Sequence, residues 1–240
     1  PVGFKSYAHL LYFQKPAGSP AGDELLAAKK LDRPAYFIMK ADAEEKFKYH
    51  PNPVGDAITV ETLEYEPALT QTNAKLSLPG RVVVAEAALL HPPYFVRVDI
   101  LIRDQEAKTI DIIEVKSKSI DDDTITAKFK NSSAQYAAKW LPYLYDLTFQ
   151  AEVARLNFPG YKIRPKLLLL DATKACDKDG LHQLFQIIQT QNSETGVSRV
   201  QIKTPPNLTE KDIGSLNFLR EVDVSDIVDE LRHMPIDNVA

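Results

Sequence analysis

The segment YFVRVDILIRDQEAKTIDIIEVKSKS constrains the fold more than any other part of the chain. Apolar and polar side chains alternate over Tyr94–Arg103 and again over Thr109–Ser117, a pattern typical of two half-buried strands. The link between them contains no Asn-Gly or Asp-Gly pair, which favours a four-residue turn over Gln105–Lys108. The segment therefore predicts an antiparallel hairpin in which Asp104 pairs with Thr109.

This register has a consequence for the charged residues of the hairpin. Counting back along both strands places Asp99 opposite Glu114 and Arg97 opposite Lys116. Side chains directly across an antiparallel pair are about 4.5–5.5 Å apart at Cβ, and like charges there are destabilising. A hard divalent cation would remove the repulsion, because carboxylate oxygens are the ligands that Mg²⁺ and Mn²⁺ prefer.

The preceding segment, RVVVAEAALL, predicts a third strand of the same meander. If His91–Tyr94 forms its turn, Leu90 pairs with Phe95 and Glu86 falls opposite Asp99. Three acids would then lie in one row across the sheet. A slip of one residue or a bulge would turn Glu86 to the other face.

The bulk properties are those of an ordinary globular protein. The chain has 240 residues, enough for a full core, with 29 basic and 33 acidic residues and a net charge of -4. Any nucleic-acid binding must therefore come from a local basic stripe and not from overall charge. The single cysteine, Cys176, excludes a disulfide or a cysteine-clustered metal site within this chain. No apolar run approaches 18 residues, so we expect a cytoplasmic protein that does not enter membranes.

The pattern of elements predicts an α/β fold, with α+β as an alternative. We divide the chain into a partly helical N-terminal region (1–75), a core (76–172) and an α/β extension of the same domain (173–240). Pro142 breaks the helical pattern after the meander, and helices usually start at such a residue rather than continue through it. The elements expected after the hairpin are helices at Ala134–Leu141 and from Pro142 to Asn157, a buried strand at Leu167–Leu170, an amphipathic helix at Leu181–Ile188, a strand at Val197–Lys203 and a helix at Ser225–His233.

Asp99 on one strand, followed by Glu114-Val115-Lys116 on the next, resembles the PD-(D/E)xK nuclease superfamily. The RecB-like branch, which includes CRISPR-associated exonucleases, is the most similar, and the run from Glu86 to Asp171 is similar to a bacterial domain family of that branch. The resemblance implies a restriction-endonuclease-like core with a mixed central sheet. It also implies that Asp99 and Glu114 hold a metal ion, that the Val115 carbonyl can add a ligand and that Lys116 handles the attacking water.

The branch has a further signature and several features that this chain lacks. A glutamine on a helix after the lysine is matched by Gln150, but Ala154 stands where a tyrosine usually follows. Val98 replaces the proline of the family name, and the upstream histidine has no clear counterpart. Many relatives carry four cysteines for an iron–sulfur cluster, which Cys176 alone cannot hold; such a cluster would require a longer native protein.

Two other interpretations of these residues stay open. Asp99 and Glu114 can be surface acids that pair with Arg97 and Lys116, since such pairs are common and weak. Glu86 is equally compatible with a ligand and with a solvated surface acid. The basic residues near the hairpin can form a DNA track with neighbouring aromatic rings, or a solvated linker beside core aromatics. The residues expected to bind nucleic acid are Lys118, Lys128 and Lys130, together with Arg97 and Gln150.

The sequence thus favours a deoxyribonuclease that depends on Mg²⁺ or Mn²⁺ and hydrolyses phosphodiester bonds in single-stranded DNA or at duplex ends. Asp99 and Glu114 are the expected ligands, with Glu86 and the Val115 carbonyl as further candidates, and Lys116 is the expected catalytic lysine. The alternatives are a catalytically idle nuclease-fold module that binds nucleic acid or a protein, and a structural α/β domain with a charged hairpin face.

Overall fold

The computed structural model describes residues 58–60, 62, 64–121, 129–130, 135–175, 184, 186–191, 198–203, 205–206, 212 and 218–234. Most of the N-terminal region predicted over 1–75 lies outside these residues, as do Lys128 and Cys176.

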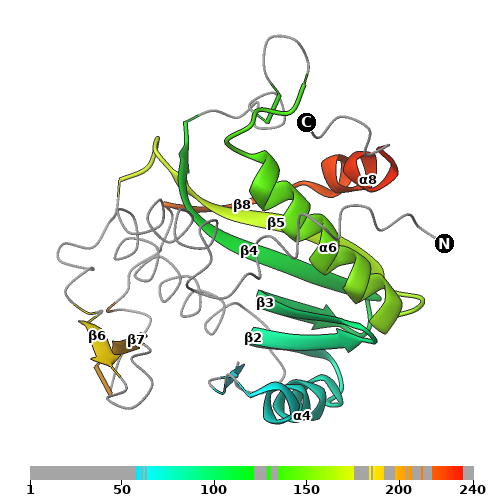
Figure 1. Cartoon of the computed structure of the whole chain (residues 1–240), viewed down its shortest axis with the longest axis vertical. Coiled ribbons are helices and arrows are strands. Elements are labelled where there is room, and N and C mark those ends of the chain that lie inside the picture. The colour runs from blue at the N-terminus through cyan, green and yellow to red at the C-terminus, as the bar shows by residue number, and fades with distance from the viewer. Residues whose placement is uncertain are drawn as a thin grey trace.

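The described residues form a six-stranded sheet, a separate two-stranded sheet and three helices (Figure 1). The strand order of the large sheet is β1-β2-β3-β4-β5-β8, and β6 pairs with β7 in the small one. The elements are β1 (Ile58–Thr59), α4 (Tyr65–Leu76), β2 (Arg81–His91), β3 (Tyr94–Asp104), β4 (Thr109–Ile120), α6 (Leu141–Asn157), β5 (Lys162–Asp171), β6 (Gln186–Gln191), β7 (Ser198–Lys203), β8 (Leu219–Asp223) and α8 (Ser225–His233).

The large sheet is mixed, which confirms the predicted α/β class. Strands β2, β3 and β4 form an antiparallel meander, and β4 and β5 are parallel and connected through α6. The short β1 adds parallel to β2, and β8 adds antiparallel to β5. β1 and β8 lie outside residues 76–172, so segments from both flanks of the predicted core complete one sheet.

The strand register of the meander agrees with the prediction from loop lengths. Asp104 pairs with Thr109 at the β3–β4 turn, and the ladder continues in that register to Ile100 and Ile113. At the β2–β3 turn, Leu90 pairs with Phe95, as expected. Both turns are short, so each leaves one favourable register in which the apolar side chains share a face.

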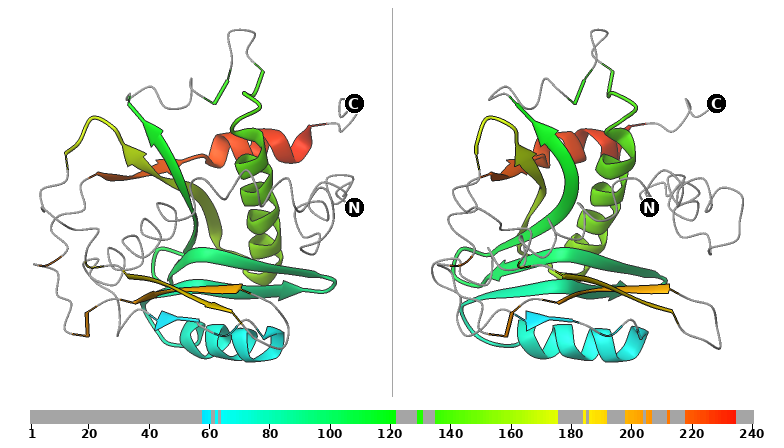
Figure 2. Two further views of the ribbon diagram at one scale, coloured as in Figure 1. Left: turned by 60° about the vertical axis from the view of Figure 1, so that its left-hand side comes forward. Right: turned by 90° about the vertical axis from the view of Figure 1, so that its left-hand side faces the viewer.

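The helices cover the sheet from different sides. α6 packs across β2 to β5, with α8 beside it on β5 (Figure 1). α4 packs on β2, on the opposite side of the β2–β3 ribbon from α6 (Figure 2). Fully buried Leu144 and Leu147 of α6 belong to the same core cluster as Ile112 of β4 and Leu167 of β5.

Two predicted helices are wrong in part. Residues 135–140 form turns and a single bridge from Tyr136 to Lys130, and the helix begins only at Leu141, with Pro142 in its first turn. A proline is tolerated in that first turn, because the missing N–H would have no helical partner there.

The predicted amphipathic helix at Leu181–Ile188 is replaced from Gln186 onward by strand β6. Two isoleucines and a threonine favour a strand locally, and pairing with β7 decides between the two structures. The predicted strand near β7 and the helix at Ser225–His233 are confirmed. None of the helices in the described part of the chain has the length and apolar character that crossing a bilayer requires.

Candidate functional site

The candidate site lies where β3 and β4 separate. Their ladder ends at Ile100 and Ile113, so Asp99 and Glu114 are the next residues in the same register but no longer form a ladder pair. Beyond this point β3 stays with β2, whereas β4 stays with β5 and curves away (Figure 2). The two predicted acids therefore lie at the fork between two diverging ribbons.

Both acids are buried at this fork. The exposed fraction is 8% for Asp99 and 5% for Glu114. The backbone N–H of Val115 donates to Asp99 Oδ2 at 2.9 Å, which ties the Asp99 carboxylate to the strand that carries Glu114.

The environment of Glu114 favours its protonated form. Burial and the charge of Asp99 raise the pKa of Glu114 to about 7, Asp146 adds to the rise, and Lys116 opposes it. Burial is the largest cause, because a carboxylate loses its hydration inside the protein, and the negative charge of Asp99 is the next. The repulsion that the sequence predicted between Asp99 and Glu114 is thus present in the structure.

Lys116 lies beside the acids. Its Nζ forms an ion pair with Glu114 Oε1, and the lysine side chain is only 14% exposed. The same Nζ lies 5.2 Å from the centre of the Tyr143 ring, which is within cation–π range. Tyr143 comes from the first turn of α6, so the helix covers the lysine as well as the acids.

Gln150 reaches the site from the middle of α6. It is 3% exposed, and its Nε2 donates to Glu114 Oε2 at 2.9 Å. Nε2 also lies 3.4 Å from Asp146 Oδ1, one helical turn earlier. The amide oxygen of Gln150 is buried and has no hydrogen-bond partner among the described residues. Each such buried acceptor calls for a water, an ion or a functional role to account for it.

Glu86 falls opposite Asp99 in the predicted register but is not paired in the ladder. The β2–β3 ladder pairs Ala85 with Ile100 and Ala87 with Val98 but omits Glu86. Glu86 has φ 55°, a left-handed conformation that is strained for a residue with a side chain. Its Oε2 lies 3.6 Å from Nη2 of Arg97, so the carboxylate engages a cation of the neighbouring strand.

Arg97 is used for contacts within the protein. Its Nη1 and Nη2 donate to the carbonyls of Thr62 and Val60, both at 2.9 Å. In the ladder Arg97 pairs with Ala88 of β2, and pairing with Lys116 does not occur because β3 and β4 have already separated. A contact between Arg97 and nucleic acid remains a prediction.

Of the other basic residues predicted to bind nucleic acid, only some lie near the site. Lys118 is partly exposed and follows Lys116 in the stretch of β4 where the register with β5 shifts. Lys130 pairs with Glu230 of α8 at 3.0 Å and lies over the Tyr136 ring, so it has a partner within the fold. Lys128 lies outside the described residues.

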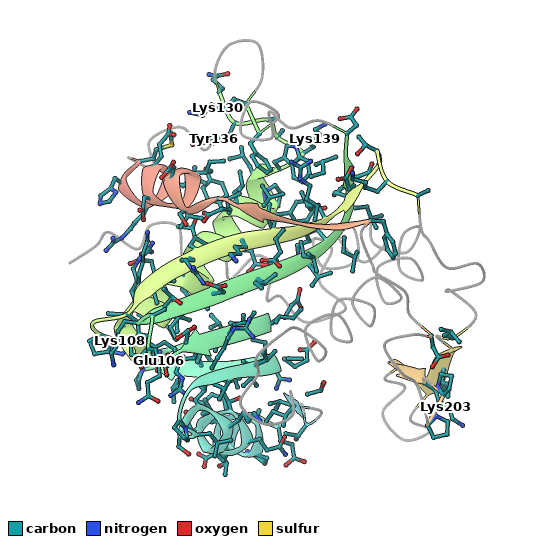
Figure 3. The ribbon with its side chains drawn as sticks, turned by 180° about the vertical axis from the view of Figure 1, so that it is seen from behind. Glu106, Lys108, Lys130, Tyr136, Lys139 and Lys203 are labelled. Carbon is teal, nitrogen blue, oxygen red and sulfur yellow. The ribbon has the colours of Figure 1, made fainter. Side chains whose placement is uncertain are left out.

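Figure 3 shows where these cations lie in the molecule. Lys130, Tyr136 and Lys139 gather at one end, and Glu106 and Lys108 of the β3–β4 turn lie at the opposite end. A basic and aromatic surface formed by Lys130, Tyr136 and Lys139 would therefore come from the connection between β4 and α6.

Two residues of the site were not predicted as functional. Asp146 and Tyr143 share a helix face with Gln150 at three- to four-residue spacing, and that spacing was the available signal. Once Gln150 is a candidate, residues three or four positions earlier on the same helix face become candidates as well.

The donor atoms suit a hard divalent cation. Asp99 and Glu114 supply carboxylates, and the Gln150 amide oxygen is a buried acceptor without a hydrogen-bond partner in the described part of the chain. No group of three or more His, Cys, Asp or Glu side chains among the described residues could hold a metal ion. Two carboxylates are still sufficient for Mg²⁺, which keeps several waters and takes further oxygens from a substrate phosphate.

No protein-family model matches the chain, and no match was found among curated proteins or solved structures. The nuclease resemblance therefore depends on the residues of this chain alone.

Proposed function

We propose that the chain is a metal-dependent nuclease that hydrolyses phosphodiester bonds in DNA. The observation that carries the proposal is the convergence at one fork of Asp99, Glu114 and Lys116. These residues come from two strands that diverge at that point, and burial and the charge of Asp99 raise the pKa of Glu114 although Lys116 lowers it. Mg²⁺ or Mn²⁺ is the proposed metal.

The roles of the residues follow from their positions. Asp99 and Glu114 would hold the cation, which would supply Lewis-acid activation of the phosphoryl oxygen and of a water. Lys116, in contact with Glu114, would orient that water or offset charge that develops on the phosphate. The Val115 N–H keeps Asp99 oriented toward β4, so the two carboxylates hold their relative position.

The architecture supports a restriction-endonuclease-like core. The sheet is mixed, contains an antiparallel meander of β2, β3 and β4, and is flanked by helices. The acids come from the second and third strands of that meander, and Gln150 comes from the next helix. This is the order of elements in which the sequence resemblance places them.

A second candidate is a catalytically idle module of the same fold. The observation that favours it is the protein's own neutralisation of the acids. Glu114 is bonded to Lys116 and Gln150, and Asp99 accepts from the Val115 N–H. An idle module would keep these contacts as a buried structural network and would not respond to a cation.

The two candidates can be separated with purified protein and end-labelled single-stranded and duplex DNA in Mg²⁺, Mn²⁺ or EDTA. The nuclease proposal expects cleavage that requires the cation and is lost in Asp99→Asn and Glu114→Gln. Glu221→Gln, on strand β8 at the edge of the same sheet, is the matched control and should cleave like the parent. Cleavage in EDTA, or equal cleavage by the Asp99 and Glu114 variants, would contradict the proposal.

A further inference from the structure

The amide of Gln150 has a defined orientation in the structure. Its Nε2 has two protons, and carboxylate oxygens of Glu114 and Asp146 lie on that side at 2.9 and 3.4 Å. A flipped amide would place Oε1 against the same two carboxylates, where acceptors would face acceptors. The carboxylates of Glu114 and Asp146 therefore fix the amide orientation in which Nε2 faces them and Oε1 points away from both.

Asp146 and Gln150 belong to one rigid element. They are four residues apart on α6, the spacing at which Gln and Asp side chains meet on a helix surface. Glu114, in contrast, belongs to β4 and also contacts Lys116. Asp146 is therefore an acceptor that stays beside Gln150 even if Glu114 shifts.

The consequence of this orientation is a buried oxygen that has no hydrogen-bond donor among the described residues. Leaving a buried acceptor unsatisfied costs about 1–3 kcal/mol, so a water, cation or donor group that meets it would stabilise the site. Amide oxygens are ligands of hard cations and acceptors for the waters that such cations retain.

We propose that Asp146 is a positioning residue that orients the Gln150 amide, so that Nε2 holds the Glu114 carboxylate and Oε1 stays available as an acceptor for a cation-bound water. This inference rests on the proposed function, because it assigns Gln150 to the same cation as Asp99 and Glu114. It adds a residue, Asp146, that acts through hydrogen bonding and does not itself touch the cation.

The proposal is tested by Mn²⁺ titration calorimetry on the parent and on four variants: Asp146→Ala, Asp146→Asn, Gln150→Met and the double variant Asp146→Ala/Gln150→Met. Removing an outer partner of a metal site typically lowers affinity about 10–100-fold. Asp146→Ala and Gln150→Met should each weaken Mn²⁺ binding on this scale. Asp146→Asn should retain the affinity, because its amide oxygen still accepts from Nε2.

The double variant should be no weaker than Gln150→Met alone, because two residues that act through one group are not additive. Alanine is the best helix former, so Asp146→Ala should fold. Asp229→Ala, an acid on α8 that pairs with Arg155, is the control for loss of one helix carboxylate and should bind Mn²⁺ like the parent.

A second readout needs no metal. In ¹H–¹⁵N spectra of the EDTA-treated protein, the Gln150 side-chain amide proton that faces Asp146 should be protected in the parent and in Asp146→Asn and should lose protection in Asp146→Ala. Parent-like spectra and Mn²⁺ affinity in Asp146→Ala would overturn the inference and leave the proposed function standing. A parent that neither binds Mn²⁺ nor cleaves DNA would overturn the proposed function and this inference with it.

Discussion

Two buried acids on β4, Asp111 and Glu114, have opposite electrostatic environments. They are three residues apart, so the pleat of the strand directs them to opposite faces of the sheet. Asp111 is 4% exposed and forms ion pairs with both Arg164 and Lys166 of β5. Glu114 is 5% exposed and faces Gln150 of α6.

The charge balance differs between the two faces. Burial lowers the pKa of Lys166, but its hydrogen bonds and charge contacts with Glu221 and Asp111 outweigh this effect and raise it. Around Glu114, burial and two further carboxylates raise the pKa, and Lys116 is the cation that opposes them. Asp111 thus has two cationic partners on β5, whereas the pKa of Glu114 is raised by burial and two carboxylates in spite of Lys116, so an added cation would favour its ionised form.

We expect the largest difference between the alanine variants of two lysines, Lys116 beside Glu114 and Lys166 beside Asp111. Lys116→Ala should reduce DNA cleavage by about a hundredfold or more, the scale of one lost transition-state contact. Its Mn²⁺ affinity should stay near that of the parent, because the ligands remain. Lys166→Ala should cleave normally but lose about 1–3 kcal/mol of stability, because Asp111 and Glu221 each lose a buried partner. Cleavage assays, calorimetry and urea unfolding measure the three quantities, and full activity of Lys116→Ala would remove the lysine from the mechanism.

Thermal melts of Asp99→Asn and Asp111→Asn compare the acids directly. Without metal, Asp99→Asn should be at least as stable as the parent, because it removes a repelling charge at nearly constant shape. At a hundredfold excess of Mn²⁺ over Kd, the parent should gain about 2.7 kcal/mol. That gain raises Tm by roughly 2–4 °C per kcal/mol, and Asp99→Asn should not show it. Asp111→Asn should instead be destabilised and keep the metal response; an equal Mn²⁺ response in parent and Asp99→Asn would refute Asp99 as a ligand.

The pH dependence of stability should also distinguish the two acids. The pKa of Glu114 is raised from 4.5 to about 7 in the folded protein, so the native state holds more protons than the unfolded state between these values. Without metal, the free energy of unfolding should therefore fall as pH rises from 4.5 to about 7 and should level off above this range. The fall should be at most about 1.4 kcal/mol per pH unit. Glu114→Gln should remove this contribution in urea unfolding measured from pH 4 to 8, whereas Asp111→Asn should preserve it. A parent and a Glu114→Gln variant with parallel pH profiles would contradict the raised pKa.

The smallest effect concerns the basic residues outside the two clusters. Each lost phosphate contact lowers the magnitude of the salt slope of DNA binding by about 0.7 for a single strand and about 0.9 for a duplex. Lys118→Ala should show a change on this scale. Lys130→Ala should change the slope less, because Glu230 already pairs with that lysine. Binding isotherms over a series of salt concentrations measure the slope, and an unchanged value for Lys118→Ala would assign that lysine to the solvated surface.

Much of the candidate site could be predicted because it depends on local patterns. Alternation and short turns determined that Asp99 and Glu114 are equivalent positions on adjacent strands. Helical spacing placed Gln150 on the same helix face as Asp146. The start of α6 followed from Pro142, which fits only the first turn of a helix.

The errors occurred where distant contacts overrode local preference. Residues before Pro142 favour a helix by composition, but Tyr136 instead bridges to Lys130 and bonds to Glu230 of α8. The segment from Gln186 becomes a strand because β7 pairs with it. Glu86, by contrast, keeps the predicted register opposite Asp99, although its left-handed backbone forms no ladder pair.

The sequence by itself determined which residues share a strand or helix face and how the meander is registered, because side-chain periodicity and loop length are local properties. The tertiary structure decided where the β3–β4 ladder ends and which β4 acid α6 covers. It also decided that Asp111 meets two cations of β5 whereas Glu114 meets further carboxylates. The contacts of Glu114 with α6 and of Asp111 with β5 join residues more than 30 positions apart in the chain, and such contacts form only when the sheet and its helices pack together.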